Sequence, residues 1–395
     1  MNAPVRAGGR TYYPHVEGLR GVAALYVFLF HIWQIAVQNA ASGTLLGWFA
    51  ATQYFLQYGH FAVAVFIVIS GYCLALPVAA RDGLRFDAKK FFVRRAWRLM
   101  PAYVPVVLLS VIPFAAAALL QGKHVNPPHI ALAVGMHLAL VHNLFYATTE
   151  YLNGPLWSIA LECQIYVAFA LVLIPVWRRF GLVAQLGVAL ALGLAPHFVL
   201  HSFDWTSPWL CGLFGMGVAA AAFTARAESL PKLPWKLLAL AATVVAVALL
   251  SQFRDNVTPD GMLWVPDVAL GAAVALFFVA SAHDGRMLPA RFLATRPIVL
   301  LGTFSYSLYL IHAPLVDVAG AALHRAHAGS LTSALAWGAL VPVVLLLAYG
   351  FYRVFERPFL SSGFKAAMDA ETGVKPPAPA SAPRAVVVRD ELARG

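Results

Sequence analysis

Long apolar runs of about 20 residues dominate the chain, and short polar or charged stretches separate them. A helix of that length matches the hydrocarbon thickness of a bilayer. Eleven such segments can be read, at 18–38, 60–80, 101–120, 129–146, 155–177, 181–200, 207–225, 234–252, 263–281, 297–322 and 332–355. The short alternating pattern of outer-membrane barrel strands is missing from the sequence. The pattern therefore predicts an all-α polytopic membrane protein.

Basic residues indicate on which side of the membrane each connection lies. The stretch 81–98 holds five arginines and two lysines against two aspartates, whereas 39–59 carries no charge. All later basic connections fall on the cytoplasmic side only if segment 129–146, which contains three histidines, does not cross. We therefore predict about ten transmembrane helices plus one re-entrant or interfacial helical segment, with both termini in the cytoplasm.

Composition supports this class and excludes others. Of the 395 residues, 61% are hydrophobic and 11% are charged, and the mean hydropathy is +0.74. The net charge of +11 comes from basic residues between spans, so we do not expect nucleic-acid binding. Cys73, Cys163 and Cys211 lie in apolar runs without metal-binding spacing, so we expect structural thiols and no metal site.

The character of the chain changes near residue 361. Residues 361–395 are rich in proline and alanine with scattered charge, which is typical of a disordered cytoplasmic tail. We therefore expect one membrane domain, 1–360, followed by this tail. The N-terminal region runs directly into the first apolar segment, so we expect no cleaved signal peptide.

Two ionisable residues stand out inside apolar segments, His31 in the first and Glu162 in the fifth. Charge inside a bilayer is costly, which makes both functional candidates. Helix rise places each about 20 Å from the cytoplasmic side of a ~30 Å core, and Arg20 projects from nearly the same face as His31. A neutral histidine beside a carboxylate suits proton abstraction from a hydroxyl group. Hydrogen bonding between helices is the alternative role for His31.

A group of arginines, Arg94, Arg95 and Arg98, lies at the cytoplasmic start of the third segment. Guanidinium groups bind phosphates bidentately, and coenzyme A carries several phosphates. The alternative is a purely topological role next to anionic lipid headgroups, and the residues alone leave both interpretations open.

Six short motifs occur in order along the chain. They are EGLRGVAALYVFLFH at 17–31, FIVISGY at 66–72, RRAWRLMP at 94–101, LWSIALE at 156–162, GTFSYSLYLIHAPL at 302–315 and ERPF at 356–359. Together they resemble the integral-membrane acyltransferase-3 family, which includes bacterial O-antigen and exopolysaccharide O-acetyltransferases. The resemblance covers residues 11–360 and is closest to the single-domain form, without an SGNH-hydrolase domain.

The resemblance implies an activity and a set of site residues. Family members move an acyl group, usually acetyl, from cytoplasmic acyl-coenzyme A to a hydroxyl of a glycan or another cell-envelope acceptor. The family's Arg-x10-His motif matches Arg20 and His31, its Arg-x-x-Arg motif matches Arg95 and Arg98, and its conserved span glutamate matches Glu162. We accordingly expect a multi-pass enzyme of the inner (plasma) membrane that uses acetyl-coenzyme A as co-substrate and holds no permanent cofactor.

These assignments lead to a mechanistic hypothesis. Coenzyme A phosphates would bind the arginines, His31 would act as general base, and Glu162 would orient it. Further candidates for binding the acceptor or stabilising the oxyanion are Ser305, Tyr306, Ser307, Tyr309 and His312. Ser158 is a weaker candidate, for which hydrogen bonding between helices is the favoured alternative, and Trp157 is either an interface anchor or a platform on which a sugar stacks.

Two functions from other classes compete with this hypothesis. A proton-coupled secondary transporter also uses intramembrane histidine and glutamate, but the chain lacks the inverted repeat typical of such proteins. A haem protein would need paired axial histidines, and His137 and His142 have a poor same-face spacing. The identity of the acceptor, the acyl group and the oligomeric state stay open.

Overall fold

The computed structural model describes residues 5–7, 10–39, 52, 54–80, 86–226, 233–252 and 262–372. In these residues the regular structure is helical apart from one antiparallel hairpin, β1 (Val5–Ala7) and β2 (Arg10–Tyr12). Predictions that involve residues 81–85, Lys232 or the tail residues 373–395 lie outside the described parts.

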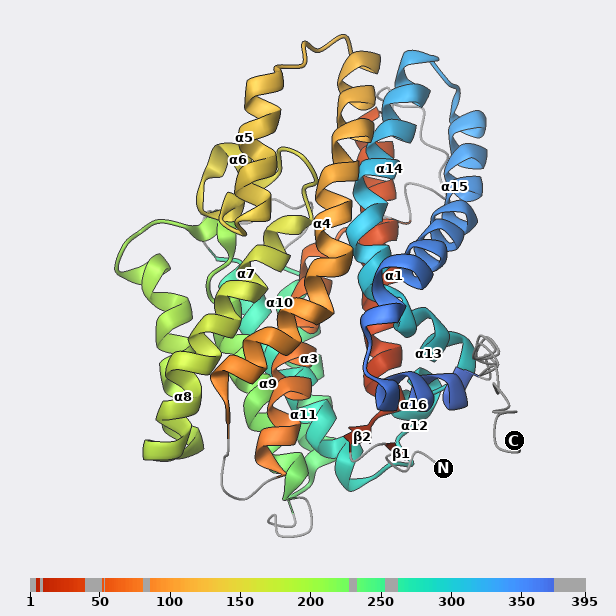
Figure 1. Ribbon diagram of the computed structural model, residues 1–395. Helices are drawn as coiled ribbons and strands as arrows, with labels where there is room; N and C mark the ends of the chain where they lie inside the picture. Colours follow the sequence, from red (N-terminus) through yellow and green to blue (C-terminus); the bar gives the residue numbers. More distant parts are fainter. Residues whose placement is uncertain are drawn as a thin grey trace, which may run out of the picture.

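The helices form an elongated bundle, as Figure 1 shows. In chain order the α-helices are α1 (Pro14–Asn39), α3 (Gly59–Ala79), α4 (Ala88–Leu120), α5 (Pro127–Leu138), α6 (Tyr146–Thr149), α7 (Leu156–Ala168), α8 (Ile174–Phe198), α9 (Leu210–Ala225), α10 (Trp235–Leu250), α11 (Trp264–His283), α12 (Leu288–Leu293), α13 (Arg296–Thr303), α14 (Ser305–Arg325), α15 (Ser330–Phe351) and α16 (Ser362–Thr372). Two π-helical turns, η2 (Phe169–Leu173) and η6 (Tyr352–Glu356), continue α7 and α15. Short 3₁₀ turns are η1 (His142–Leu144), η3 (Asp204–Thr206) and η7 (Arg357–Phe359).

Eight helical stretches in the described residues are long and apolar enough to cross a membrane, so the chain is an all-α polytopic membrane protein. One of them, Leu156–Phe198, is broken at Gly181, whose φ of 86° lies outside the helical region. The apolar helix α10, with 16 residues, is shorter than these eight stretches and is not among them. Helix α5 has only 12 residues, which agrees with a segment that does not cross. The count of ten spans and the side of each terminus stay predictions.

Three boundaries differ from those expected. Helix α4 has 33 residues, about 50 Å, and includes most of the basic stretch predicted as a connection. The apolar run 297–322 is divided between α13 and α14, with the break at Phe304. The predicted tail is not irregular at its start, because α16 contacts the β-hairpin, Asp369 pairs with Arg357 at 2.9 Å, and Met368 is buried.

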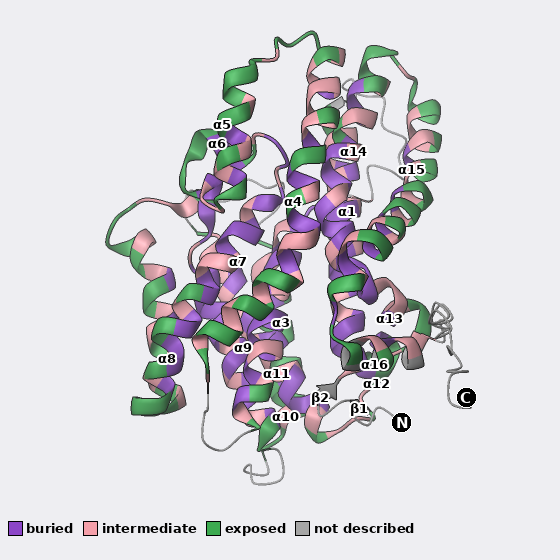
Figure 2. Cartoon of the chain, viewed as in Figure 1, coloured by how far each residue is buried: buried purple, intermediate pink, exposed green. Residues whose placement is uncertain are grey.

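The core lies along α3 and α9, and Figure 2 shows the buried residues concentrated on these helices and on α1. Glycine allows the two backbones to approach closely. A Cβ atom added at Gly71 would overlap the carbonyl group of Phe214, and one at Gly217 would overlap that of Val68. The outward faces of α8, α10 and α15 carry exposed leucines and valines, as expected for surfaces in contact with lipid.

Candidate active site

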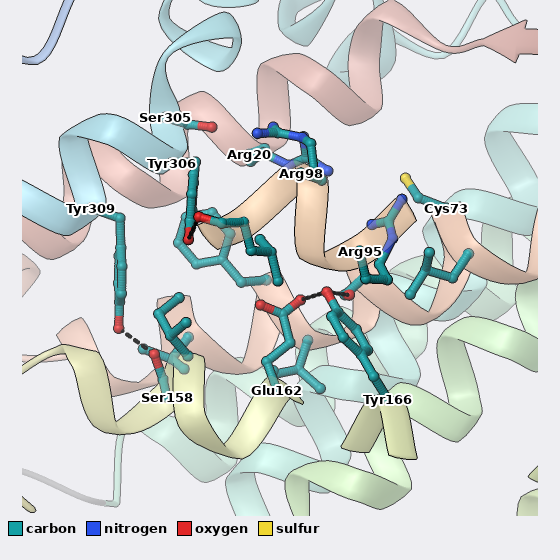
Figure 3. A pocket seen from close by; sticks show the side chains of 17 residues that line it. Arg20, Cys73, Arg95, Arg98, Ser158, Glu162, Tyr166, Ser305, Tyr306 and Tyr309 are labelled. Atoms are coloured by element: carbon teal, nitrogen blue, oxygen red, sulfur yellow. Dashed lines mark hydrogen bonds between the residues drawn. The ribbon is translucent and has the colours of Figure 1, made fainter. Parts of the chain in front are cut away.

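A cavity of about 110 Å³ lies inside the bundle, between α1, α3, α4, α7 and α14 (Figure 3). Its apolar wall includes Phe66, Ile67 and Leu99. Its polar lining residues are Arg20, Ser70, Cys73, Arg95, Arg98, Ser158, Glu162, Tyr166, Ser305, Tyr306 and Tyr309. Five of the six motifs therefore meet at one place, although they are spread over 290 residues of sequence, from Arg20 to Tyr309.

Three arginines form one side of this cavity, and their charges are unequally matched. Nη1 of Arg20 lies 3.2 Å from Oε1 of Glu17, and Nη1 of Arg98 lies 2.8 Å from Oε1 of Glu356. Arg95 makes no ion pair with any described residue. It is therefore the guanidinium that is most available to an anionic ligand.

The fourth predicted arginine, Arg94, does not take part. It is exposed on α4 and does not line the cavity, although it neighbours Arg95 in sequence. Positions 94 and 95 both lie within about one turn of position 98, but only Arg95 and Arg98 line the cavity, whereas the Arg94 side chain is exposed. The structure thus separates Arg94 from the site.

The buried partner Glu356 was not predicted. It lies in the π-helical turn η6, is 2% exposed, and also accepts a 2.6 Å hydrogen bond from Oγ of Ser307. Burying a carboxylate requires a cation and hydrogen-bond donors, which Arg98 and Ser307 supply. Glu356, the first residue of the ERPF motif, thus fixes the position of the Arg98 side chain without itself lining the cavity. The sequence signal was the motif itself, which the prediction left without a role.

Glu162 faces the cavity but does not meet His31, so the predicted contact between them is wrong. Its Oε1 accepts a 2.6 Å hydrogen bond from the Tyr166 hydroxyl, which lies 3.1 Å from Oγ of Ser70. Figure 3 shows the Glu162 carboxylate pointing toward Tyr166. Both residues are on α7, one turn apart, so the tyrosine takes the position expected for the histidine.

His31 instead contacts His312 of α14, and Nδ1 of His31 lies 3.2 Å from Nε2 of His312. Nδ1 of His312 lies 3.1 Å from the Leu308 carbonyl oxygen, so it carries a proton and leaves Nε2 as an acceptor. Nδ1 of His31 also lies 2.8 Å from the Val27 carbonyl oxygen. This geometry fixes the proton of neutral His31 on Nδ1 and leaves the Nε2 lone pair free.

Tyr309 connects this histidine pair to the cavity. It lines the cavity, and its ring centroid lies 5.7 Å from that of His312. Its hydroxyl lies 2.6 Å from Oγ of Ser158, and both hydroxyls also contact the Pro155 carbonyl oxygen. The two hydroxyl protons are therefore already used, which makes this pair weaker oxyanion donors than expected.

The other predicted polar residues have mixed positions. Oγ of Ser305 donates to the Gly302 carbonyl oxygen at 2.8 Å, and the Tyr306 hydroxyl donates to that of Leu99 at 3.3 Å. Trp157 does not line the cavity and instead stacks on His60. Within the described residues no group of three or more His, Cys, Asp or Glu side chains is placed to hold a metal ion.

Comparison with known proteins assigns the family. Residues 13–353 match the acyltransferase domain of the acyltransferase-3 family. The chain is 24% identical over 389 residues to peptidoglycan O-acetyltransferase OatA of Listeria monocytogenes, which covers 90% of this chain and 57% of the relative. It is 24% identical over 384 residues to O-acetyltransferase OatA of Staphylococcus aureus, which covers 90% of this chain and 58% of the relative.

The chain thus spans little more than half the length of the curated relatives it matches. No solved structure matches it. Because the family match extends over most of the chain and includes the helices around the cavity, the protein belongs to the acyltransferase-3 family and is a multi-pass membrane acyltransferase.

Proposed function

We propose that the protein transfers an acetyl group from cytoplasmic acetyl-coenzyme A to a hydroxyl group of a cell-envelope glycan. The observation that carries this proposal is the cavity, where arginines, apolar walls and a carboxylate meet inside the bundle. The names of both relatives support acetyl as the group, and the name of the Listeria monocytogenes relative supports peptidoglycan as the acceptor. The transporter alternative loses its basis, because the family match is to an acyltransferase domain.

Arg95 would make the main contact with the donor's phosphates. Its charge is unmatched, whereas Glu17 and Glu356 neutralise Arg20 and Arg98. The cavity is too small for a whole coenzyme, so the nucleotide would stay outside and the pantetheine arm would enter. The Glu162 carboxylate, on the cavity wall, would then accept a hydrogen bond from an amide N–H of the arm.

His31 would act as the general base, held by His312, which in turn contacts Tyr309 of the cavity lining. Nε2 of His31 takes the proton of the acceptor hydroxyl while the hydroxyl oxygen attacks the thioester carbonyl carbon. The carbon–sulfur bond then breaks, the proton returns from His31 to the departing thiolate, and free coenzyme A and the O-acetyl ester are formed. His312 is a positioning residue in this scheme, because its Nε2, together with the Val27 carbonyl oxygen, keeps the His31 proton on Nδ1.

The test uses the full chain in lipid nanodiscs with isotope-labelled acetyl-coenzyme A and de-O-acetylated muropeptides. We expect labelled muropeptide esters by mass spectrometry and a loss of about 100-fold or more in kcat for His31→Ala. His124→Ala is the control, since His124 is exposed and remote from the cavity lining. Full turnover by His31→Ala would remove His31 from the mechanism, and wild-type protein that forms no ester would refute the proposed acceptor.

His312 needs a readout that a purely structural role would not change. In His312→Gln the amide oxygen can still accept from Nδ1 of His31, whereas in His312→Leu the Val27 carbonyl oxygen is the only acceptor that remains. We expect His312→Gln to keep much of kcat, and His312→Leu to lose kcat while KM for acetyl-coenzyme A stays constant. Equal losses in both variants would contradict the positioning role.

A further inference from the structure

A second polar cluster lies outside the cavity, where four helices begin. It consists of His60 in the first turn of α3, Trp157 in the first turn of α7, Trp209 directly before α9, and Asp267 in the first turn of α11. None of these residues lines the cavity. The cluster therefore has no role in the scheme above.

Asp267 is the anchor of the cluster. It is fully buried, and its Oδ2 accepts hydrogen bonds from Nε1 of Trp209 at 2.7 Å and from Nε2 of His60 at 3.0 Å. Its Oδ1 is buried without a partner in the described residues. Because an ionised carboxylate can only accept hydrogen bonds, it favours a proton on Nε2 of His60 and fixes the orientation of the ring.

Two polar atoms of the cluster, one on His60 and one on Trp157, make no hydrogen bond with the described residues. The side chain of His60 is 24% exposed, and its Nδ1 makes no hydrogen bond with the described residues. The same holds for the indole N–H of Trp157, whose ring lies nearly parallel to that of His60, at 10°, with centroids 6.1 Å apart. A partly exposed aromatic surface thus carries two polar atoms without a protein partner.

The cluster is connected to the cavity through α7. Trp157 contacts His60, and the next residue, Ser158, lines the cavity and contacts Tyr309. Tyr309 in turn contacts His312, the partner of the proposed base. A ligand held on Trp157 would therefore lie at the start of the helix that also carries Glu162.

We propose that His60 and Trp157, held by Asp267, form a subsite for one sugar unit of the acceptor glycan. The indole face binds the apolar C–H face of the ring, and its N–H binds a sugar oxygen. A sugar hydroxyl both donates and accepts, so it satisfies Nδ1 of His60 in either protonation state. The subsite binds the acceptor and takes no part in breaking or forming bonds.

This inference rests on the proposed function, since it assumes a glycan acceptor. Its kinetic test measures KM for both substrates of the full chain in nanodiscs, with muropeptides and acetyl-coenzyme A. We expect Trp157→Ala and His60→Gln each to raise KM for muropeptide at least tenfold, while KM for acetyl-coenzyme A changes less than twofold. Tyr146→Ala is the matched control, because Tyr146 is an exposed aromatic residue of α6 outside the cluster.

Asp267→Asn tests the anchor without removing volume. The amide retains an oxygen that accepts from His60 and Trp209 but loses the negative charge, so we expect a smaller rise in KM for muropeptide.

Unchanged muropeptide KM in Trp157→Ala and His60→Gln would overturn the inference while turnover itself would still support the proposed function. An equal rise in both KM values would also overturn it.

Direct binding separates the two proposals. We expect chitotetraose at millimolar concentration to raise the Tm of the wild-type protein without any donor, and to leave the Tm of Trp157→Ala unchanged. Stabilisation without acetyl transfer would support the subsite and contradict the proposed function. Wild-type protein that is not stabilised would overturn the subsite.

Discussion

Arg95 gives the sharpest prediction, because the preceding residue, Arg94, provides a matched control. Arg95 lines the cavity and has no carboxylate partner among the described residues, whereas Arg94 is exposed and turned away. Replacing either with alanine removes one positive charge from the same turn of α4. A topological role predicts the same result for both variants, and a donor-binding role predicts different results.

The magnitude follows from the lost contact. A charge-assisted hydrogen bond contributes about 1.5–3 kcal/mol. We therefore expect Arg95→Ala to raise KM for acetyl-coenzyme A about 10- to 100-fold, at 1.4 kcal/mol for each factor of ten. Arg94→Ala should change it less than about twofold, because exposed charges interact weakly with a distant ligand.

The assay compares acetyl-coenzyme A with acetyl-pantetheine, a donor that has the same thioester but no phosphates. The wild-type enzyme should favour acetyl-coenzyme A in kcat/KM, and Arg95→Ala should lose most of that preference. Arg94→Ala should keep it. If Arg95→Ala lowers kcat/KM equally for both donors, Arg95 does not bind phosphate, and the assignment of the donor end of the cavity is refuted.

Three further predictions concern stability. Arg98→Ala should destabilise the protein by about 3–5 kcal/mol because it leaves the buried Glu356 carboxylate unpaired, and Glu356→Gln should restore part of the lost Tm in the double variant. Burial and a stacked neighbouring imidazole lower the pKa of His142 to about 3. The folded protein therefore keeps His142 neutral, while the unfolded chain binds a proton below about pH 6.5, so lowering the pH from 7 to 5 should cost about 2 kcal/mol through this residue. Thermal unfolding of His142→Phe should show a smaller loss over that range, and an unchanged pH dependence would contradict the assignment. A Cβ at Gly217 would overlap the backbone of α3, so Gly217→Ala should cost about 1–3 kcal/mol, whereas Gly135→Ala, with open space around it, should not lower Tm.

Hydropathy predicted the helices well because lipid requires every span to satisfy its own backbone hydrogen bonds. Hydropathy could not locate the helix breaks and helix ends that depend on packing. The break at Phe304 lies within a continuous apolar run, and α4 continues through basic residues that hydropathy excludes from a span. Likewise, the composition at 362–372 resembles a tail, yet Met368 is buried and Asp369 pairs with Arg357.

The sequence indicated many of the polar residues that line the cavity, but it also included Arg94 and Trp157, which do not line it, and it did not predict how the side chains pair. Helix rise placed His31 and Glu162 at similar depth, but depth says nothing about the rotation of one helix against another. That rotation places His31 beside His312 and Glu162 beside Tyr166. The roles of Glu17 and Glu356 were also hidden, because both lie at the ends of apolar runs, where a charged residue needs no special explanation.

These pairings make the distribution of charge in the cavity asymmetric. Glu17 and Glu356 neutralise two of the three arginines, so one unmatched cation, Arg95, shares the cavity with one carboxylate, Glu162, that is hydrogen-bonded only to a neutral tyrosine among the described residues. A thioester donor has phosphates at one end and amide N–H groups along its arm, which complements that polarity. Three unpaired arginines would attract any anion, including lipid headgroups, in many orientations. Glu17 and Glu356 therefore weaken the attraction of the cavity for anions in general. They favour one orientation of the thioester donor, in which its acyl end points toward Tyr309 and the histidine pair.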